Sequence, residues 1–238
     1  MKRLLFPGNI SGRFGHVTAF FTGRDPGADL GKIGRIIGFD ENHIYLPVQK
    51  HTDTVIVPGA DLRPKIADAV VTNRKDILIG IQVADCVPIL LYDACRGVIG
   101  AAHAGWRGTA AGILKNTIRT FTERFSSNPR DILMAIGPSI KSCCYEVDPD
   151  VAHAVAEASG YADHIQLSHT EEGYIRKKGA KYHVDLPLAN KYQALSDGIR
   201  PENIWIAQDC TFCNPDTYCS YRYAGGTTCR QGGFIGMR

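Results

Sequence analysis

Apolar residues occur along this chain in short runs separated by polar or glycine-rich segments. The runs at 77–83, 87–92 and 98–102 are rich in β-branched residues, and this pattern predicts buried strands. Further strands are predicted at 132–136, 203–207 and 234–237.

Helical periodicity is present in three other segments. In 109–125, apolar residues recur every three or four positions, which predicts an amphipathic helix. Asp148 and Pro149 have the pattern of an N-cap followed by a first helical residue, so a helix is expected through 158. A third helix is predicted at 186–196 and ends before Gly198 in the C′ position. The polar stretch 160–181 between these helices is expected to be a long surface loop or a hairpin.

The order of these elements predicts an α+β fold, with mixed β-sheets flanked by helices in a single compact domain spanning residues 1–238. Strands outnumber helices and do not alternate strictly with them, which argues against a Rossmann arrangement. The chain contains no internal repeat, linker, GxGxxG segment or Walker-type loop, so dinucleotide and P-loop chemistry have no support.

Composition narrows the class of partner. The chain is 44% hydrophobic and 21% charged, as in an ordinary globular protein, and its formal net charge is +3. This charge is too small to indicate nucleic acid or a membrane surface as a partner, although it is compatible with a local site for a small anion. The start MKRLLFPGNI resembles a signal peptide, but Pro7 interrupts the apolar run early, and we expect a cytoplasmic protein.

Eight cysteines are present. Without an export signal, we expect reduced thiols, some of which bind metal, rather than a disulfide framework. The spacing Cys210-x2-Cys213 with Cys219 and Cys229 beyond it leaves open a second, structural zinc site. Cys143 and Cys144 are adjacent, and a disulfide between them would strain the peptide that joins them.

Three segments each place a metal-binding side chain at an end of a predicted strand. They are Gln49-Lys50-His51, the ADCVP segment around Cys86, and the HAGWRG segment that begins at His103. Imidazole and thiolate suit zinc, and three protein ligands leave a fourth position for water or substrate, as in catalytic sites. A zinc ion lowers the pKa of its bound water towards ~7. From the residues alone, a buried small cysteine and a core histidine remain an alternative.

Charged residues near these segments are further candidates. Arg107 lies in a glycine-flanked turn before a predicted helix, where a guanidinium and backbone N–H groups favour phosphate. Arg222 and Arg230 are weaker candidates for the same anion pocket. Asp85 precedes Cys86, where it would act as an acid or base, orient a ligand, or cap a turn.

Taken together with ADAVVT, GPSIKSCCYEV and the C-terminal segments NPD, SYR and CRQGGFI, these motifs resemble the YfiH-type family from His51 to the C-terminus. That family is also called the laccase-domain or multicopper polyphenol oxidase family. The resemblance implies a zinc-dependent purine nucleoside phosphorylase with adenosine deaminase activity, which acts on adenosine, inosine or methylthioadenosine with phosphate. It also implies that His51, Cys86 and His103 are the zinc ligands.

The chain departs from the family pattern at several positions. Thr52 stands where glycine usually follows the histidine, and Gly23 is inserted before Arg24. The region before His51 is expected to lack the family's Asn-Leu-Gly segment and the helix after it. Cys229 stands where glycine is usual.

Three other functions remain open at this stage. Copper-dependent oxidation of phenols is the reaction in the family's older name, but a blue-copper site favours a weak axial ligand such as methionine, and the chain has three methionines. A cysteine hydrolase would use Cys86 as nucleophile and His103 as base. A role in peptidoglycan editing is the third.

Overall fold

Two β-sheets packed face to face form the centre of the molecule. The computed structural model describes residues 4–159 and 174–238. One sheet has five strands in the order β1-β2-β14-β6-β3: Leu4–Leu5, Val17–Thr22, Gln231–Met237, Leu78–Val83 and Ile44–Tyr45. The other has six strands in the order β13-β9-β7-β8-β5-β4: Ile204–Ile206, Ile132–Ile136, Val87–Asp93, Val98–Ala104, Ala69–Thr72 and Val55–Ile56.

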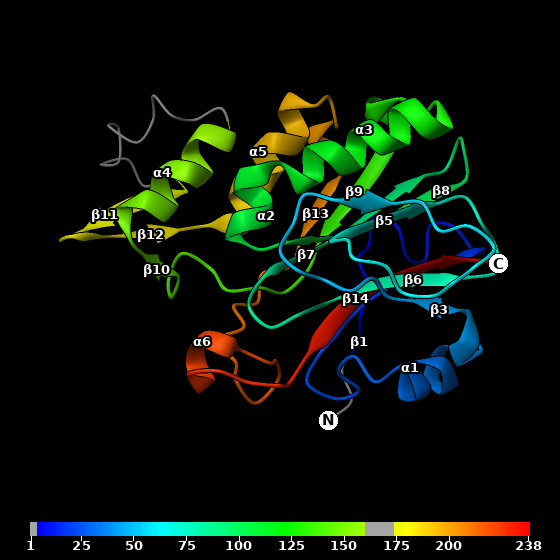
Figure 1. The fold of residues 1–238 in the computed structure, drawn as a ribbon, viewed down its shortest axis with the longest axis horizontal. Coiled ribbons are helices and arrows are strands. Elements are labelled where there is room, and N and C mark those ends of the chain that lie inside the picture. The colour runs from blue at the N-terminus through cyan, green and yellow to red at the C-terminus, as the bar shows by residue number, and fades with distance from the viewer. Residues whose placement is uncertain (1–3, 160–173) are drawn as a thin grey trace.

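Helices cover the outer faces of this pair of sheets (Figure 1). Helices α2 (Trp106–Ala111) and α3 (Ile113–Phe125) lie against the six-stranded sheet. Helix α5 (Leu186–Ser196) packs on α2 and α3, and α4 (Pro149–Ala158) packs on α2 and α5. Helix α1 (Leu30–Ile37) packs on the five-stranded sheet from the other side. A short helix α6 (Tyr221–Ala224) and a three-stranded sheet, β10 (Glu146–Val147), β12 (Lys181–Val184) and β11 (Ile175–Lys178), complete the fold.

The apolar pattern of the strands explains this layering. Alternate residues of β7 face opposite sides: Ile89 and Leu91 contact the helices, whereas Leu90 and Tyr92 contact the five-stranded sheet. Both faces are therefore buried, which is why these strands have almost continuous apolar sequences. The predicted α+β fold with mixed sheets and flanking helices in one compact domain is confirmed.

Several predicted elements have the expected bounds. β9 covers the run 132–136, and α4 begins after its Asp148 cap with Pro149 in the first turn. α5 covers 186–196 and is followed by Gly198 at a φ of 94°. The predicted loop or hairpin at 160–181 lies partly outside the described residues, and its end contributes to the β11–β12 hairpin.

Two predictions were wrong in detail. The helix expected at 109–125 is two helices, because Gly112 adopts a left-handed φ of 82° between α2 and α3. The helix expected to be missing before His51 is present as α1. Its N-cap is Asp29 in the sequence Asp-Leu-Gly, and the Asp29 carboxylate accepts the N–H of Lys32, as expected since aspartate and asparagine are both preferred N-caps.

Within the described residues, no helix has both the length and the apolar character needed to cross a membrane.

Candidate metal centre

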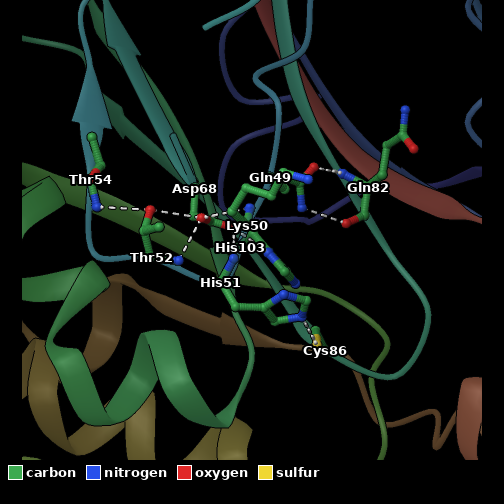
Figure 2. A network of polar contacts seen from close by, with 9 residues as sticks. All are labelled: Gln49, Lys50, His51, Thr52, Thr54, Asp68, Gln82, Cys86 and His103. Atoms are coloured by element: carbon green, nitrogen blue, oxygen red, sulfur yellow. Dashed lines mark hydrogen bonds and ion pairs between the residues drawn. The ribbon is translucent and has the colours of Figure 1, made fainter. Parts of the chain in front are cut away.

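The structure brings His51, Cys86 and His103 together from three separate segments. His103 lies in β8, Cys86 lies in the turn between β6 and β7, and His51 lies before β4. The candidate ligand atoms of the three residues all lie within 4.8 Å of one another, and His51 Nε2 is 3.9 Å from Cys86 Sγ. Figure 2 shows the two imidazole rings and the thiol converging on one point. The arrangement has the donor set and the compactness that a zinc ion requires.

Asp68 organises this cluster, and the sequence analysis did not identify it. Its buried carboxylate accepts from His103 Nδ1 at 2.8 Å, which leaves Nε2 of the ring to face Cys86. A carboxylate behind a metal-binding histidine fixes the tautomer and the orientation of the ring. The signal in the sequence that could have identified Asp68 is the presence of an acidic residue inside the apolar segment ADAVVT.

The same carboxylate shapes the backbone at His51. It accepts the consecutive N–H groups of Lys50, His51 and Thr52 at 3.1, 3.1 and 2.6 Å (Figure 2). Such a run of N–H groups around one anion forms a nest, and here His51 adopts a left-handed φ of 59°. Thr52, at the position where the family usually has glycine, adds a hydroxyl bond to Asp68 at 2.8 Å. Threonine in place of glycine therefore adds a hydrogen bond to Asp68 that helps to hold the backbone of His51.

Gln49 attaches this turn to the five-stranded sheet. Its side chain donates to the carbonyl of Gln82 at 2.8 Å and accepts the N–H of Gln82 at 2.7 Å, in the manner of a strand partner for β6. The segment Gln49-Lys50-His51 is thus held at both ends.

The charges of the cluster are mutually stabilising. Burial raises the pKa of the Cys86 thiol, but hydrogen bonds and charges from His103 and His51 outweigh burial and lower its pKa to about 6. Burial lowers the pKa of His103, but Asp68 and Cys86 outweigh that effect and raise its pKa to about 9. For Asp68 the hydrogen bonds from His103, Thr52 and Lys50 overcome burial and hold its pKa far below the usual range. At neutral pH the metal-free cluster therefore holds a Cys86 thiolate beside a protonated His103, and a bound metal ion would displace the proton from His103 Nε2.

Gly105 leaves the space that the ligands occupy. A Cβ atom at this position would lie 2.8 Å from Cys86 Sγ and 3.2 Å from the His51 ring. Its φ of −71° is open to any residue, so the constraint on this glycine is steric rather than conformational.

The cluster lies in the wall of a cavity of about 730 Å³. Three of the predicted residues, Arg107, Arg222 and Arg230, also line this cavity. The Arg107 guanidinium stacks over Trp106 at 4.4 Å, and that of Arg222 lies 5.3 Å from the Tyr145 ring. Trp106 and Tyr145 also line the cavity. The sequence analysis did not identify Tyr145, because it lies in a loop that comes later in the chain than the three segments of the candidate metal centre.

Asp85 lines the cavity, but both of its carboxylate oxygens have partners within the chain. One accepts from the Thr211 hydroxyl at 2.6 Å, and the other accepts from the N–H of Arg222, at the start of α6, at 2.7 Å. Asp85 itself has a left-handed φ of 83°. Among the roles considered from the sequence, these contacts match the capping of a turn next to Cys86.

The cysteines differ from expectation. Cys219 and Cys229 form a disulfide, so the expectation of reduced thiols was wrong for this pair, whereas the other six cysteines are free. Their Cα atoms, in segments that flank α6, lie 5.6 Å apart, a separation that suits a disulfide. The second zinc site that the sequence left open, made of Cys210, Cys213, Cys219 and Cys229, is therefore excluded in that form, because two of its four thiols are paired with each other.

Residues 28–238 match the family described as multi-copper polyphenol oxidoreductase laccase. The chain belongs to this family. The resemblance seen in the site motifs is thereby confirmed over most of the chain.

Individual relatives of this laccase-family chain have more specific names. Purine nucleoside phosphorylase YlmD of Bacillus subtilis (strain 168) is 36% identical over 174 residues, which are 73% of this chain and 60% of that protein. Adenosine deaminase RL5, from an unknown prokaryotic organism, is 32% identical over 199 residues, with 79% and 73% covered. The crystal structure of YlmD from Geobacillus stearothermophilus aligns with a TM-score of 0.83 at 26% identity, and the alignment covers 96% of this chain and 94% of that one. The alignment to the first of these relatives spans less than two thirds of that relative's length.

Proposed function

We propose that this chain is a zinc-dependent purine nucleoside phosphorylase that also deaminates adenosine. The observation that carries the proposal is that one cavity wall contains both the His51–Cys86–His103 cluster and three arginines. The names of the relatives point to the same two reactions.

The metal would be held by His51, Cys86 and His103, whose donor set suits zinc with an open fourth position. When bound, zinc supplies Lewis-acid activation of water or of a substrate oxygen at neutral pH. Asp68 keeps His103 in the tautomer that offers Nε2. His51 is the exposed member of the set and His103 the buried one, and all three side chains line the cavity, so a substrate in the cavity would have access to a metal held by them.

Phosphate would be bound by the arginines. Arg222 uses Nη1 to donate to the carbonyl of Glu146, and Arg230 uses Nη1 to donate to the carbonyls of Thr227 and Cys229. Each guanidinium has five N–H donors, so these anchored side chains retain donors for a ligand. Asp85 is the acidic residue in the lining, and its carboxylate is already occupied. The cavity is therefore suited to an anion.

The nucleoside would occupy the remaining volume beside Trp106 and Tyr145. A cavity of about 730 Å³ falls within the range of small-molecule sites, ~300–1,000 Å³. Burial raises the pKa of Tyr145 well above its usual value, so its hydroxyl stays neutral and available as a hydrogen-bond donor to the base.

In phosphorolysis, a phosphate oxygen forms a bond to C1′ of the ribose as the bond from C1′ to the purine nitrogen breaks, and the purine leaves with the bonding electron pair and gains a proton. The arginines would hold the phosphate in line and balance its charge. In deamination, water adds to C6 of adenosine and ammonia leaves, so inosine is formed without phosphate.

Product analysis separates these reactions. Adenosine without phosphate is expected to give inosine and ammonia, and added phosphate is expected to give adenine and ribose 1-phosphate in addition. Cys86→Ala is expected to lose the zinc ion of this site and both activities, whereas Cys95→Ala, at an exposed free cysteine, keeps both. Turnover that is unchanged in metal-free Cys86→Ala protein would overturn the proposal.

Arg107→Gln tests the phosphate site independently. A charge-assisted hydrogen bond contributes about 1.5–3 kcal/mol, so kcat/KM for phosphorolysis should fall by about 10- to 150-fold. Deamination uses no phosphate and should change much less. Arg63→Gln, at an exposed arginine paired with Asp61, is the matched control and should leave both reactions unchanged. Equal losses in both reactions for Arg107→Gln would show that Arg107 does not act through phosphate.

A second candidate function uses the same residues without a metal. Asp68, His103 and Cys86 are connected in the order carboxylate, imidazole, thiol, which is the arrangement of a cysteine hydrolase. Alkylation of Cys86 with iodoacetamide distinguishes the two candidates. Protection by stoichiometric zinc, with loss of turnover when zinc is removed, supports the metal enzyme. Turnover of an amide substrate by zinc-free protein supports the hydrolase.

Copper-dependent phenol oxidation is tested with the same preparations. Neither Met134 in β9 nor Met237 in β14 lines the cavity, so the described part of the chain (4–159 and 174–238) provides no thioether there for an axial copper ligand. Oxidation of a phenolic dye should therefore remain at background when copper replaces zinc.

A further inference from the structure

Four cysteines outside the candidate metal centre gather into a compact group. The ligand atoms of Cys143, Cys144, Cys210 and Cys213 all lie within 4.8 Å of one another. Cys144 Sγ is 3.3 Å from Cys213 Sγ and 3.5 Å from Cys143 Sγ, and Cys143 Sγ is 3.8 Å from Cys213 Sγ. A disulfide requires sulfur atoms about 2.05 Å apart, so these separations correspond to no bonded pair.

The separations match a shared ion. Four sulfurs that each lie about 2.3 Å from one zinc ion are about 3.8 Å from one another in a tetrahedron. The three sulfur–sulfur distances given above differ from this value by at most half an ångström. We propose that Cys143, Cys144, Cys210 and Cys213 form a second zinc site, of the four-cysteine type, which joins the loop 139–146 to the loop 209–214.

Backbone hydrogen bonds hold the two cysteine-bearing loops side by side. Ser139 and Cys210 form a parallel β-bridge, and the N–H of Thr211 donates to the carbonyl of Ser139 at 3.1 Å. The chain then turns at Lys141, whose carbonyl accepts the N–H groups of Cys144 and Tyr145 at 3.0 and 2.9 Å. The first loop therefore presents adjacent cysteines to the Cys210-x2-Cys213 turn of the second.

Cys210 also has the hydrogen bonds that zinc-binding sulfur atoms receive. The backbone N–H of Lys141 lies 3.5 Å from its sulfur, and the backbone N–H of Cys213 donates to the same atom. Such donors orient a thiolate and reduce its negative charge. The Lys141 ammonium, which donates to the carbonyl of Ala207 at 2.8 Å, adds a positive charge beside a site whose four thiolates and one zinc ion sum to −2.

Both loops contribute to the catalytic cavity. Ile140 and Tyr145, on either side of the cysteine pair, line it. Thr211, next to Cys210, donates to Asp85 beside Cys86. A zinc ion that holds the two loops together would therefore be structural and would keep the cavity wall in place. The inference does not depend on which reaction the cavity catalyses.

Metal counting tests the site directly. Protein purified anaerobically with a reductant, loaded with zinc and freed of excess by gel filtration, should contain two zinc ions per chain. Cys144→Ser/Cys213→Ser should contain one, and so should Cys86→Ala, since each change removes a different site. The control Cys95→Ser, at an exposed free cysteine outside both groups, should contain two. One zinc ion per wild-type chain, and none in Cys86→Ala, would overturn the proposal.

A second measurement keeps the test valid if the double variant fails to fold. In Cys86→Ala protein loaded with cobalt, four thiolates should give strong thiolate-to-cobalt charge-transfer absorption with tetrahedral d–d bands. Cobalt that binds without this absorption, or a persistent Cys144–Cys213 disulfide under reductant, would refute the site. Because the signal is read in a protein without the catalytic metal, failure of this proposal and failure of the phosphorylase proposal are distinguishable.

Discussion

Asp68→Asn is the sharpest perturbation of the candidate metal centre, because it changes charge and hydrogen bonding with almost no change in shape. One carboxylate oxygen accepts from His103 Nδ1 and the N–H of His51. The other accepts from the N–H groups of Lys50 and Thr52 and from the Thr52 hydroxyl. An asparagine has one carbonyl oxygen, so at least two of these donors lose their acceptor.

The expected loss of stability follows from these bonds. Each hydrogen bond to a charged group contributes about 1.5–3 kcal/mol. Removal of one member of a buried charged pair costs about 3–5 kcal/mol, and we expect a loss of this size in the unfolding free energy of the metal-free protein. An amide N–H that faces Nδ1 also favours the other tautomer of His103, in which Nε2 carries the proton and cannot bind a metal. Zinc affinity should therefore fall by about 10- to 100-fold.

Urea denaturation of metal-free protein and zinc titration against a competing chelator measure the two effects separately. Asp93→Asn is the matched control, since Asp93 is equally buried and only its Oδ1 has partners, the N–H groups of Cys95 and Arg96, while its Oδ2 has none. An asparagine satisfies the same two donors, so zinc affinity should be unchanged. If Asp68→Asn keeps wild-type zinc affinity, the carboxylate does not orient His103.

Three further perturbations test other parts of the molecule. Gly105→Ala places a methyl group 2.8 Å from Cys86 Sγ and should weaken zinc binding at least 10-fold by calorimetric titration. The control Gly59→Ala has open space around it and should leave the affinity unchanged, and equal affinities for the two variants would contradict the steric argument. Burial raises the pKa of Asp197, so the contribution of its neutral side chain to stability is fully present below the unfolded-state pKa of about 3.9 and is lost as the pH rises through the higher folded-state pKa. Asp197→Asn should therefore raise stability at pH 7 by less than about 1 kcal/mol, with solvent screening included, and the gain should be largely absent at about pH 3 in parallel urea unfolding curves. The Cys219–Cys229 disulfide closes a short loop, so Cys219→Ser/Cys229→Ser should lower the unfolding free energy by about 2–3 kcal/mol. If the difference is equally large when wild type and variant are both reduced, the loss of stability comes from the packing of the buried Cys219 and not from the disulfide.

Local signals in the sequence predicted those elements whose limits are set within a few residues. Pro149 begins α4 and Gly198 follows α5, because proline fixes φ at a helix start and glycine accepts a left-handed φ after a helix end. The strand β9 is delimited by its own apolar run. Gly112 was harder to interpret, since apolar spacing continues across α2 and α3, which pack on the same sheet.

The sequence by itself also determined which residue types are available to bind a metal, because His51, Cys86 and His103 each lie in a short motif with a recognisable pattern. Only the tertiary structure decided what supports them and how the other cysteines are paired. Asp68 serves His51 and His103 at once, Cys143 and Cys144 meet Cys210 and Cys213, and Cys219 bonds to Cys229. Apart from the disulfide, which spans 10 residues, these contacts join segments that are well separated in the chain, and they depend on strand order and loop packing, which no local periodicity encodes.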